Sequence, residues 1–236
     1  MDGCGQEDSD SPALLVVAHP DDESMFFAPL ILELTVRRGL RVALLCLSTG
    51  NADGLGRVRS KELYRACSIL GVEPEDVVLV DDARLPDGMH QHWQPEAVAE
   101  HVAQAVQRFR PSQVYTFDGG GVSGHPNHLA AAAGVLHWWA ASPSSSSPAS
   151  LPQVWQLETV ALPRKYTGLF DAPFSWVSTV LRRQQHSGGV QLCVNLRRPR
   201  RAWRALFAHG SQMVWYRRLW MLLSRYMYVN TLVRRF

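Results

Sequence analysis

The sequence predicts an α/β fold: a mostly parallel, Rossmann-like sheet with helices on both faces, in a single domain with a helical addition at its C-terminal end. Short apolar runs alternate with longer segments whose apolar residues recur at helical spacing, and polar or glycine-containing loops follow the runs. The 236 residues are 46% hydrophobic and 19% charged, which suits one sizeable core. We expect residues 13–236 to form this domain behind a disordered polar tail at residues 1–12.

The first predicted strand covers residues 14–18 and ends in a cluster of ionisable side chains. His19 follows it, and Asp21, Asp22 and Glu23 come next, before another apolar stretch. The three carboxylates indicate a helix start, because negative charge is favoured at a helix N-terminus. The cluster should therefore lie where a strand passes into a helix, at the sheet edge where open α/β folds bind ligands.

The other elements follow in chain order. Further strands are predicted for residues 41–47, 77–80, 113–117, 154–162 and 190–196, and helices for residues 25–38, 57–70, 95–109, 127–140, 200–209 and 211–228. Residues 142–150 are rich in serine and proline and are predicted to form a flexible surface loop, because they bury too little apolar area to offset the entropy of ordering. Gly188 and Gly189 mark a turn between less regular segments.

Two motifs carry residues suited to a metal site. His19 and Asp22 offer a nitrogen and an oxygen that suit zinc, while the neighbouring Asp21 faces another way and is left free to act as a base. Catalytic zinc usually has three protein ligands, so a second group is needed. His125 and His128 supply candidates, since they follow another predicted strand and should reach the same sheet edge. A helix cap with packed histidines is the structural alternative, but a cap needs only one such side chain.

Taken together, the two motifs resemble the phosphatidylinositol-glycan class L (LmbE-like) deacetylases. The resemblance is carried by residues 18–23 (AHPDDE), 25–29 (MFFAP), 117–128 (FDGGGVSGHPNH), 164–166 (RKY) and 224–227 (SRYM). It covers nearly the whole chain from about Leu14, and the two main motifs occur in order, each after a predicted strand. It implies an LmbE-like version of the predicted fold.

The family pattern assigns a role to each residue of the two motifs. It implies that zinc, or another divalent metal, is bound by His19, Asp22 and His128. It also implies that Asp21 is the general base and that His125 stabilises the oxyanion.

The resemblance also implies a substrate. Arg59 and Asp87 fall in loops that hold the sugar in similar enzymes, although solvated surface charges are an equally good interpretation. Asn127 stands where bacterial relatives often carry an acid. The implied activity is removal of the N-acetyl group from N-acetylglucosaminyl-phosphatidylinositol, the second step of glycosylphosphatidylinositol (GPI) anchor biosynthesis, on the cytoplasmic face of the endoplasmic reticulum membrane. The alternatives are a deacetylase of a soluble N-acetylated amino sugar and a non-enzymatic membrane-binding module.

Charge is distributed unevenly along the chain. The net charge is only +3, yet twelve arginines and no acidic residue follow Asp171. Residues 200–236 are predicted to form a basic, aromatic, helical segment that contacts an anionic membrane surface through Arg217, Arg218 and Arg225. Its aromatic residues would suit a core equally well. No recognised motif accompanies the arginines, so nucleic acid is not an expected partner.

The sequence offers no clear membrane span. Residues 1–10 are acidic, and no run of 18 apolar residues occurs, whereas the eukaryotic members that the chain resembles generally begin with a transmembrane anchor.

The cysteines form no CxxC pair and are expected to be reduced thiols facing a cytosolic compartment; they are Cys4, Cys46, Cys67 and Cys193.

Overall fold

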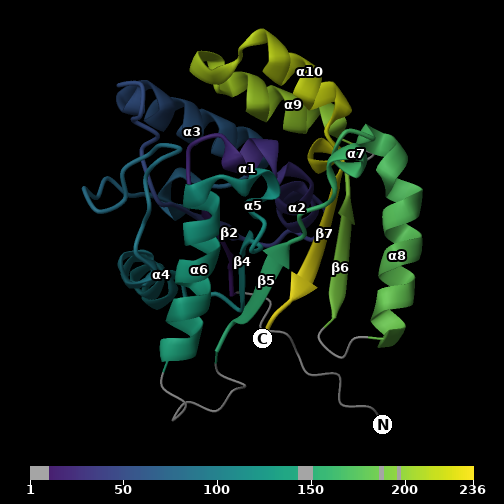
Figure 1. Cartoon of the computed structure of the whole chain (residues 1–236), viewed down its shortest axis with the longest axis horizontal. Helices are drawn as coiled ribbons and strands as arrows, with labels where there is room; N and C mark the ends of the chain where they lie inside the picture. Colours follow the sequence, from purple (N-terminus) through teal and green to yellow (C-terminus); the bar gives the residue numbers. More distant parts are fainter. Residues whose placement is uncertain (1–10, 143–150, 186–188, 196–197) are drawn as a thin grey trace.

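In the computed structural model, which describes residues 11–142, 151–185, 189–195 and 198–236, seven strands form one sheet in the order β3-β2-β1-β4-β5-β7-β6 (Figure 1). The strands are β1 Ala13–Val17, β2 Val42–Cys46, β3 Val77–Leu79, β4 Gln113–Phe117, β5 Gln153–Leu157, β6 Val190–Val194 and β7 Val229–Arg234. Strands β1 to β5 pair in parallel, and β7 runs antiparallel to both of its neighbours. The predicted mostly parallel α/β fold is confirmed.

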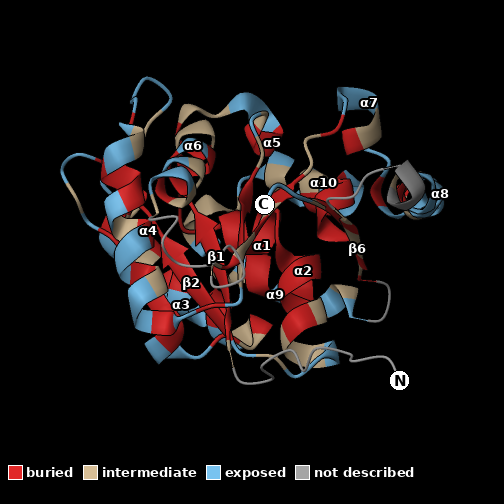
Figure 2. Cartoon of the chain, turned by 90° about the horizontal axis from the view of Figure 1, so that it is seen from below, coloured by how far each residue is buried: buried red, intermediate tan, exposed pale blue. Residues whose placement is uncertain are grey.

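Helices cover both faces of the sheet (Figures 1 and 2). The longer helices are α3 Gly56–Leu70, α4 Pro95–Phe109, α6 Pro126–Ala141, α8 Asp171–Gln185, α9 Pro199–Ala208 and α10 Trp215–Leu223. The short ones are α5 Gly121–Gly124, α7 Leu162–Lys165, and the single turns η2 Pro74–Asp76, η4 Gly168–Phe170, η5 Gly210–Gln212 and η6 Arg225–Met227. Helices α4 and α6 pack on each other and on β1, while α3 packs on α9 across the opposite face. Every residue of β1 and β2 is buried, as expected of strands covered on both sides.

The helix predicted for residues 25–38 is broken into three pieces. They are α1 Asp22–Met25, α2 Ala28–Leu32 and the π-helical η1 Glu33–Arg37. Pro29 explains the first break, because its ring has no N–H and would clash with the carbonyl one turn earlier, so α2 begins afresh at Ala28. The Asn230 side chain bridges the gap: its amide donates to the Phe26 carbonyl at 2.8 Å and accepts from the Leu30 N–H at 3.0 Å. The break therefore ties β7 to the first motif.

The C-terminal prediction was wrong in its second half. The helix expected over residues 211–228 stops at Leu223, and the chain then enters β7, which inserts between β5 and β6. The strand predicted for residues 154–162 stops at Leu157, and residues 162–185, expected to be less regular, form α7, η4 and α8. The basic residues also separate: Arg225 is fully buried against Asp171, Arg217 pairs with Asp21, and only Arg218 of the predicted membrane-binding trio is exposed. The three arginines therefore do not share one exposed surface, and the predicted contact with an anionic membrane stays a prediction.

The remaining expectations concern the N-terminal tail, the serine-rich loop, membrane spans and the cysteines. Residues 1–10 of the predicted tail and 143–150 of the predicted loop lie outside the described residues. None of the helices in the described part of the chain combines the length and hydropathy that a membrane span requires. Cys46, Cys67 and Cys193 are free and buried, as the scattered cysteine pattern predicted.

Candidate active site

The two sequence motifs meet at the carboxyl edge of β1 and β4. His19 and its neighbours follow β1, whereas His125 and His128 lie at the start of α6, beyond the loop that follows β4. The ring centroids of His19 and His125 are 4.8 Å apart, and those of His125 and His128 are 5.0 Å apart. The sheet edge thus brings together residues more than 100 positions apart, as the fold prediction required.

Asp22 and His128 face each other in a way that suits a bound cation. One Asp22 oxygen accepts the backbone N–H groups of Ala18 and His19 at 3.0 and 2.9 Å, and the other lies 3.2 Å from His128 Nε2. His128 Nδ1 lies 2.9 Å from the Gly121 carbonyl, and a bond there requires Nδ1 to carry the proton. His128 Nε2 then presents its lone pair to a carboxylate oxygen of Asp22. These two atoms need a metal ion or a proton between them. Burial raises the pKa of Asp22, but the His128 imidazole outweighs it and holds that pKa well below its usual range.

His19 is oriented by a second carboxylate. Its Nε2 lies 2.9 Å from Asp87 Oδ1 and 3.0 Å from Asn127 Oδ1, and its Nδ1 lies on the Asp22 side, 3.8 Å from Oδ2. Burial alone would lower the pKa of His19. The hydrogen bond to Asp87 and the negative charge of Asp22 outweigh burial and raise that pKa above its ordinary value. A carboxylate on one ring nitrogen commonly fixes the other toward a metal. Asp87, predicted to hold the sugar, therefore also serves to orient His19.

His125 differs from the other two histidines in its hydrogen bonding. It is the N-cap of α6, and its Nδ1 accepts the Asn127 backbone N–H at 3.2 Å, which leaves the proton on Nε2. Burial, helped by the nearby His19 and His128, lowers the pKa of His125 to about 4, so the ring is neutral at pH 7. A neutral ring with a free Nε2–H is a hydrogen-bond donor rather than a ligand.

The potential ligands therefore form two overlapping sets. The histidines His19, His125 and His128 place one ligand atom each within 4.8 Å of one another, which is one possible triad. The second possible triad contains Asp22 in place of His125, and it is the triad predicted from the sequence. The tautomer of His125 and the position of Asp22 against His128 favour the second set.

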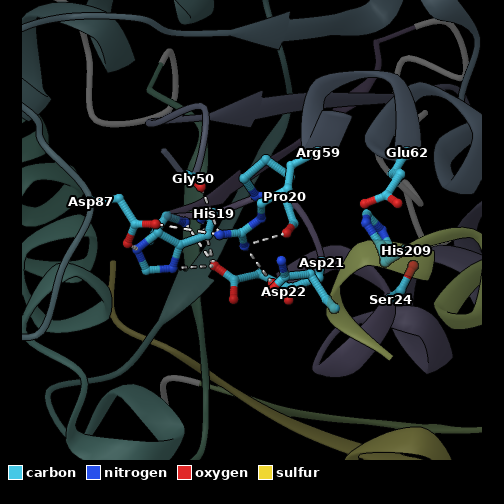
Figure 3. A network of polar contacts seen from close by, with 12 residues as sticks. His19, Pro20, Asp21, Asp22, Ser24, Gly50, Arg59, Glu62, Asp87 and His209 are labelled. Atoms are coloured by element: carbon cyan, nitrogen blue, oxygen red, sulfur yellow. Dashed lines mark hydrogen bonds and ion pairs between the residues drawn. The ribbon is translucent and has the colours of Figure 1, made fainter. Parts of the chain in front are cut away.

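Asp21 sits beside the metal-binding candidates in a strained backbone conformation. Its φ is 122°, which is rare for a residue with a side chain, and its backbone N–H donates to Glu23 Oε2 at 3.0 Å. Its carboxylate pairs with Arg59 at 3.5 Å (Figure 3). It also pairs, more closely, with Arg217 of α10. The Asp21 carboxylate thus contacts two guanidinium groups, one from α3 and one from α10.

Arg59 is anchored by backbone as well as by charge. Its guanidinium donates to the carbonyls of Pro20 and Gly50 at 2.8 and 2.9 Å and pairs with Asp87 at 3.3 Å (Figure 3). A Cβ at Gly50 would lie 2.5 Å from Arg59 Cζ, so only glycine allows this approach. Arg59 lies in α3 and not in the predicted loop, and Arg59 and Asp87 are parts of the buried site and not solvated surface charges.

Sequence reasoning missed a buried ion pair behind Asp21. Glu23 is fully buried, and its Oε1 accepts from Ser24 Oγ at 2.6 Å and contacts His209 Nε2 at 2.7 Å. His209 follows α9, and Arg217 belongs to α10, so both reach the motif from nearly 200 positions away. No local spacing links them to residues 19–23. The acidic Glu23 inside the first motif was the available signal that a buried cation must lie nearby.

Comparison with known proteins supports the site's relation to deacetylation. A family model described as PIG-L, GlcNAc-PI de-N-acetylase, matches residues 14–139. The chain is 40% identical to a protein of Schizosaccharomyces pombe named probable N-acetylglucosaminyl-phosphatidylinositol de-N-acetylase, covering 94% of this chain and 86% of that one. It is 40% identical to the Bos taurus protein named N-acetylglucosaminyl-phosphatidylinositol de-N-acetylase, covering 94% and 83%. Among solved structures, N,N'-diacetylchitobiose deacetylase from Pyrococcus horikoshii shares the fold with a TM-score of 0.60 at 17% identity, covering 89% of this chain and 76% of that one.

Proposed function

Because the chain belongs to the GlcNAc-PI de-N-acetylase (PIG-L) family, we propose that it hydrolyses the N-acetyl group of N-acetylglucosaminyl-phosphatidylinositol. The products are glucosaminyl-phosphatidylinositol and acetate, and the reaction is the second step of GPI-anchor biosynthesis. We place the enzyme at the endoplasmic reticulum membrane, with its site on the cytoplasmic face. The observation that carries the proposal is the convergence of Asp21, Asp22 and three histidines at one sheet edge, within a chain 40% identical to named de-N-acetylases.

The donor set fits a divalent metal, for which we propose zinc. His19, Asp22 and His128 would hold it, since Asp22 Oδ1 and His128 Nε2 face each other at 3.2 Å and His128 Nδ1 is engaged by the Gly121 carbonyl. A divalent ion held there would supply Lewis acidity toward the amide carbonyl and toward water, which is the chemistry that amide hydrolysis needs. Asp87 keeps His19 turned toward this centre.

Two side chains of the protein itself would carry the proton and the developing charge. Asp21 takes a proton from the attacking water and returns it to the departing amine, as a general base that becomes a general acid. His125 donates its Nε2–H to the carbonyl oxygen as negative charge builds there, and one such donor is typically worth about 3 kcal/mol. Arg59 and Arg217 contact the Asp21 carboxylate and hold it in place until substrate enters.

The test is deacetylation by the purified chain of two substrates, before and after metal removal. We expect release of acetate from N-acetylglucosaminyl-phosphatidylinositol, loss of activity on chelation, and recovery with a stoichiometric amount of zinc. Faster turnover of free N-acetylglucosamine than of the lipid would instead indicate a soluble amino-sugar deacetylase. Activity unaffected by thorough chelation would refute the metal assignment.

A further inference from the structure

Helix α8 exposes large apolar side chains and buries polar ones. Its exposed positions carry large apolar side chains, namely Phe174, Trp176, Val177, Val180 and Leu181. Its buried positions carry small polar or acidic side chains, namely Asp171, Ser175 and Thr179. A surface helix of a globular protein normally shows the reverse pattern. The polar side faces inward because it neutralises a buried cation: Asp171 and Ser175 contact the Arg225 guanidinium at 2.7 and 2.8 Å.

The neighbouring short elements and α10 expose apolar side chains too. On α7, its C-cap Tyr166 and η4 these are Leu162, Tyr166, Leu169 and Phe170, and Phe170 is 91% exposed. On α10 they are Trp215, Tyr216, Leu219, Leu222 and Leu223, whereas Met221 is the buried residue of this helix. We call the exposed apolar residues of α7, η4, α8 and α10 the docking face.

The docking face is continuous across these elements. At Gly168, where φ is +56°, a Cβ would lie 3.3 Å from the Leu222 carbonyl oxygen, so η4 packs tightly on the end of α10. Turn η4 then leads directly from Phe170 into α8 at Asp171. Figure 1 shows α7, α10 and the start of α8 beside one another, at the end of the molecule that also carries α1 and α5. An apolar surface shared by several elements marks an interaction site.

The same elements also contact the candidate active site. Arg217 of α10 pairs with Asp21, and Lys165 of α7 donates from Nζ to the Val122 carbonyl at 3.0 Å, in the short helix α5 before His125. Whatever covers the docking face therefore lies next to elements that contact the candidate active site.

The chemistry of the docking face matches a lipid bilayer. It carries tryptophan, tyrosine, phenylalanine and aliphatic residues, and Arg218 is exposed among them on α10. No aspartate or glutamate occurs after Asp171 in the sequence, so α10 and the exposed side of α8 bring no carboxylate toward lipid phosphates. Such a composition suits the boundary between headgroups and acyl chains. The proposed substrate explains why a bilayer-binding surface would be needed here, because its two acyl chains must stay in a bilayer while its sugar enters the site.

We propose that the docking face inserts into the surface of a phospholipid bilayer and presents the active-site entrance to the headgroup layer. The proposal rests on the proposed function for its choice of a bilayer as the occupant. It differs from the attachment predicted from the sequence, which relied on Arg217, Arg218 and Arg225 contacting an anionic surface, since apolar insertion should persist on uncharged lipid and at high salt.

Vesicle sedimentation tests the docking face directly. The purified chain is mixed with phosphatidylcholine vesicles, with or without phosphatidylinositol, at low and high salt. We expect co-sedimentation with both kinds of vesicle, and a loss of at least about tenfold in partitioning for the double variant Phe170→Ser/Leu219→Ser, because each side chain would lose its burial in lipid. The matched control is Val58→Ser/Tyr64→Ser, which removes two exposed apolar side chains of α3 and should bind as the unmodified chain does.

Three outcomes would overturn the proposal. One is an unmodified chain that stays in the supernatant with every vesicle, and another is equal loss of binding in the control variant. The third is a dimer in the absence of lipid that the Phe170→Ser/Leu219→Ser variant fails to form, which would make this face a protein interface.

An activity measurement separates this proposal from the proposed function. The double variant should retain turnover of a water-soluble N-acetylglucosaminyl-inositol phosphate without acyl chains, and lose turnover of the lipid embedded in vesicles. If the unmodified chain deacetylates neither substrate, the proposed function fails, while vesicle sedimentation still decides whether the docking face binds lipid.

Discussion

The buried pair between Glu23 and His209 offers a test of how the first motif is supported. Both side chains are fully buried, and His209 Nε2 lies 2.7 Å from Glu23 Oε1. Replacing His209 with Ala leaves the Glu23 carboxylate without its cation, and removing one partner of a buried pair typically costs about 3–5 kcal/mol. For a chain of this size about 1 kcal/mol shifts Tm by about 2–4 °C, so we expect Tm to fall by about 6–20 °C.

The same variant should also affect catalysis. Glu23 accepts the backbone N–H of Asp21, whose φ of 122° costs on the order of 1–3 kcal/mol and must be held by its surroundings. We therefore expect kcat to fall in His209→Ala beyond what partial unfolding explains, measured well below its Tm. The matched control is His137→Ala, because His137 lies 3.8 Å from Glu96 on the surface and such pairs contribute little. Equal changes in Tm for the two variants would refute the assigned role of the buried pair.

The pH dependence of stability follows from the same contact. Burial lowers the pKa of His209, but Glu23 and the nearby Asp21 and Glu62 raise it above its ordinary value. A raised folded-state pKa stabilises the protein fully below about pH 6.5, and the gain is lost as pH rises through the folded value. The difference in unfolding free energy between the unmodified chain and His209→Ala should therefore shrink as pH rises above about 6.5. A difference that grows over this range would show that His209 is not charged in the folded protein.

Three further predictions concern other residues. His125→Ala should lower kcat more than it raises KM in steady-state assays, because an oxyanion donor acts mainly in the transition state, and an unchanged kcat with a weakened KM would make His125 a substrate-binding residue. Asp171→Asn should lower the unfolding free energy by about 3–5 kcal/mol in denaturant titrations by leaving Arg225 unpaired, whereas the surface variant Glu96→Gln should change it by less than about 1 kcal/mol. Cys46 and Cys67 should resist alkylation in the native state, since burial raises the pKa of both thiols well above the usual value, and rapid labelling of either would contradict their buried positions.

The sequence was informative where local pattern and tertiary structure agree. Near-continuous apolar runs predicted β1, β2 and β4, and Pro95 and Gly71 marked the correct ends of α4 and α3. The two histidine-containing motifs could be placed at one sheet edge because each follows a parallel strand.

Local pattern failed where the deciding partner lies far along the chain. Strand β7 continues a segment with helical spacing, and only its neighbours β5 and β6 make it extended. The polar inner face of α8 makes sense only once Arg225 is known to lie beneath it. In the site, His209 and Arg217 lie too far along the chain from residues 21–23 for any local sequence pattern to link them. Their contacts could therefore not be deduced from the sequence.

The most direct test of the central claim compares metal content and turnover in Asp21→Asn and His128→Ala. Asp21 pairs with arginines and is assigned as the base, whereas His128 faces Asp22 across the proposed metal position. Asp21→Asn should therefore bind one equivalent of metal, as we expect of the unmodified protein, while its release of acetate from N-acetylglucosaminyl-phosphatidylinositol is lost. His128→Ala should lose both the metal and the activity. Equal loss of metal from the two variants, or full activity in Asp21→Asn, would contradict the division between base and ligand on which the proposed mechanism depends.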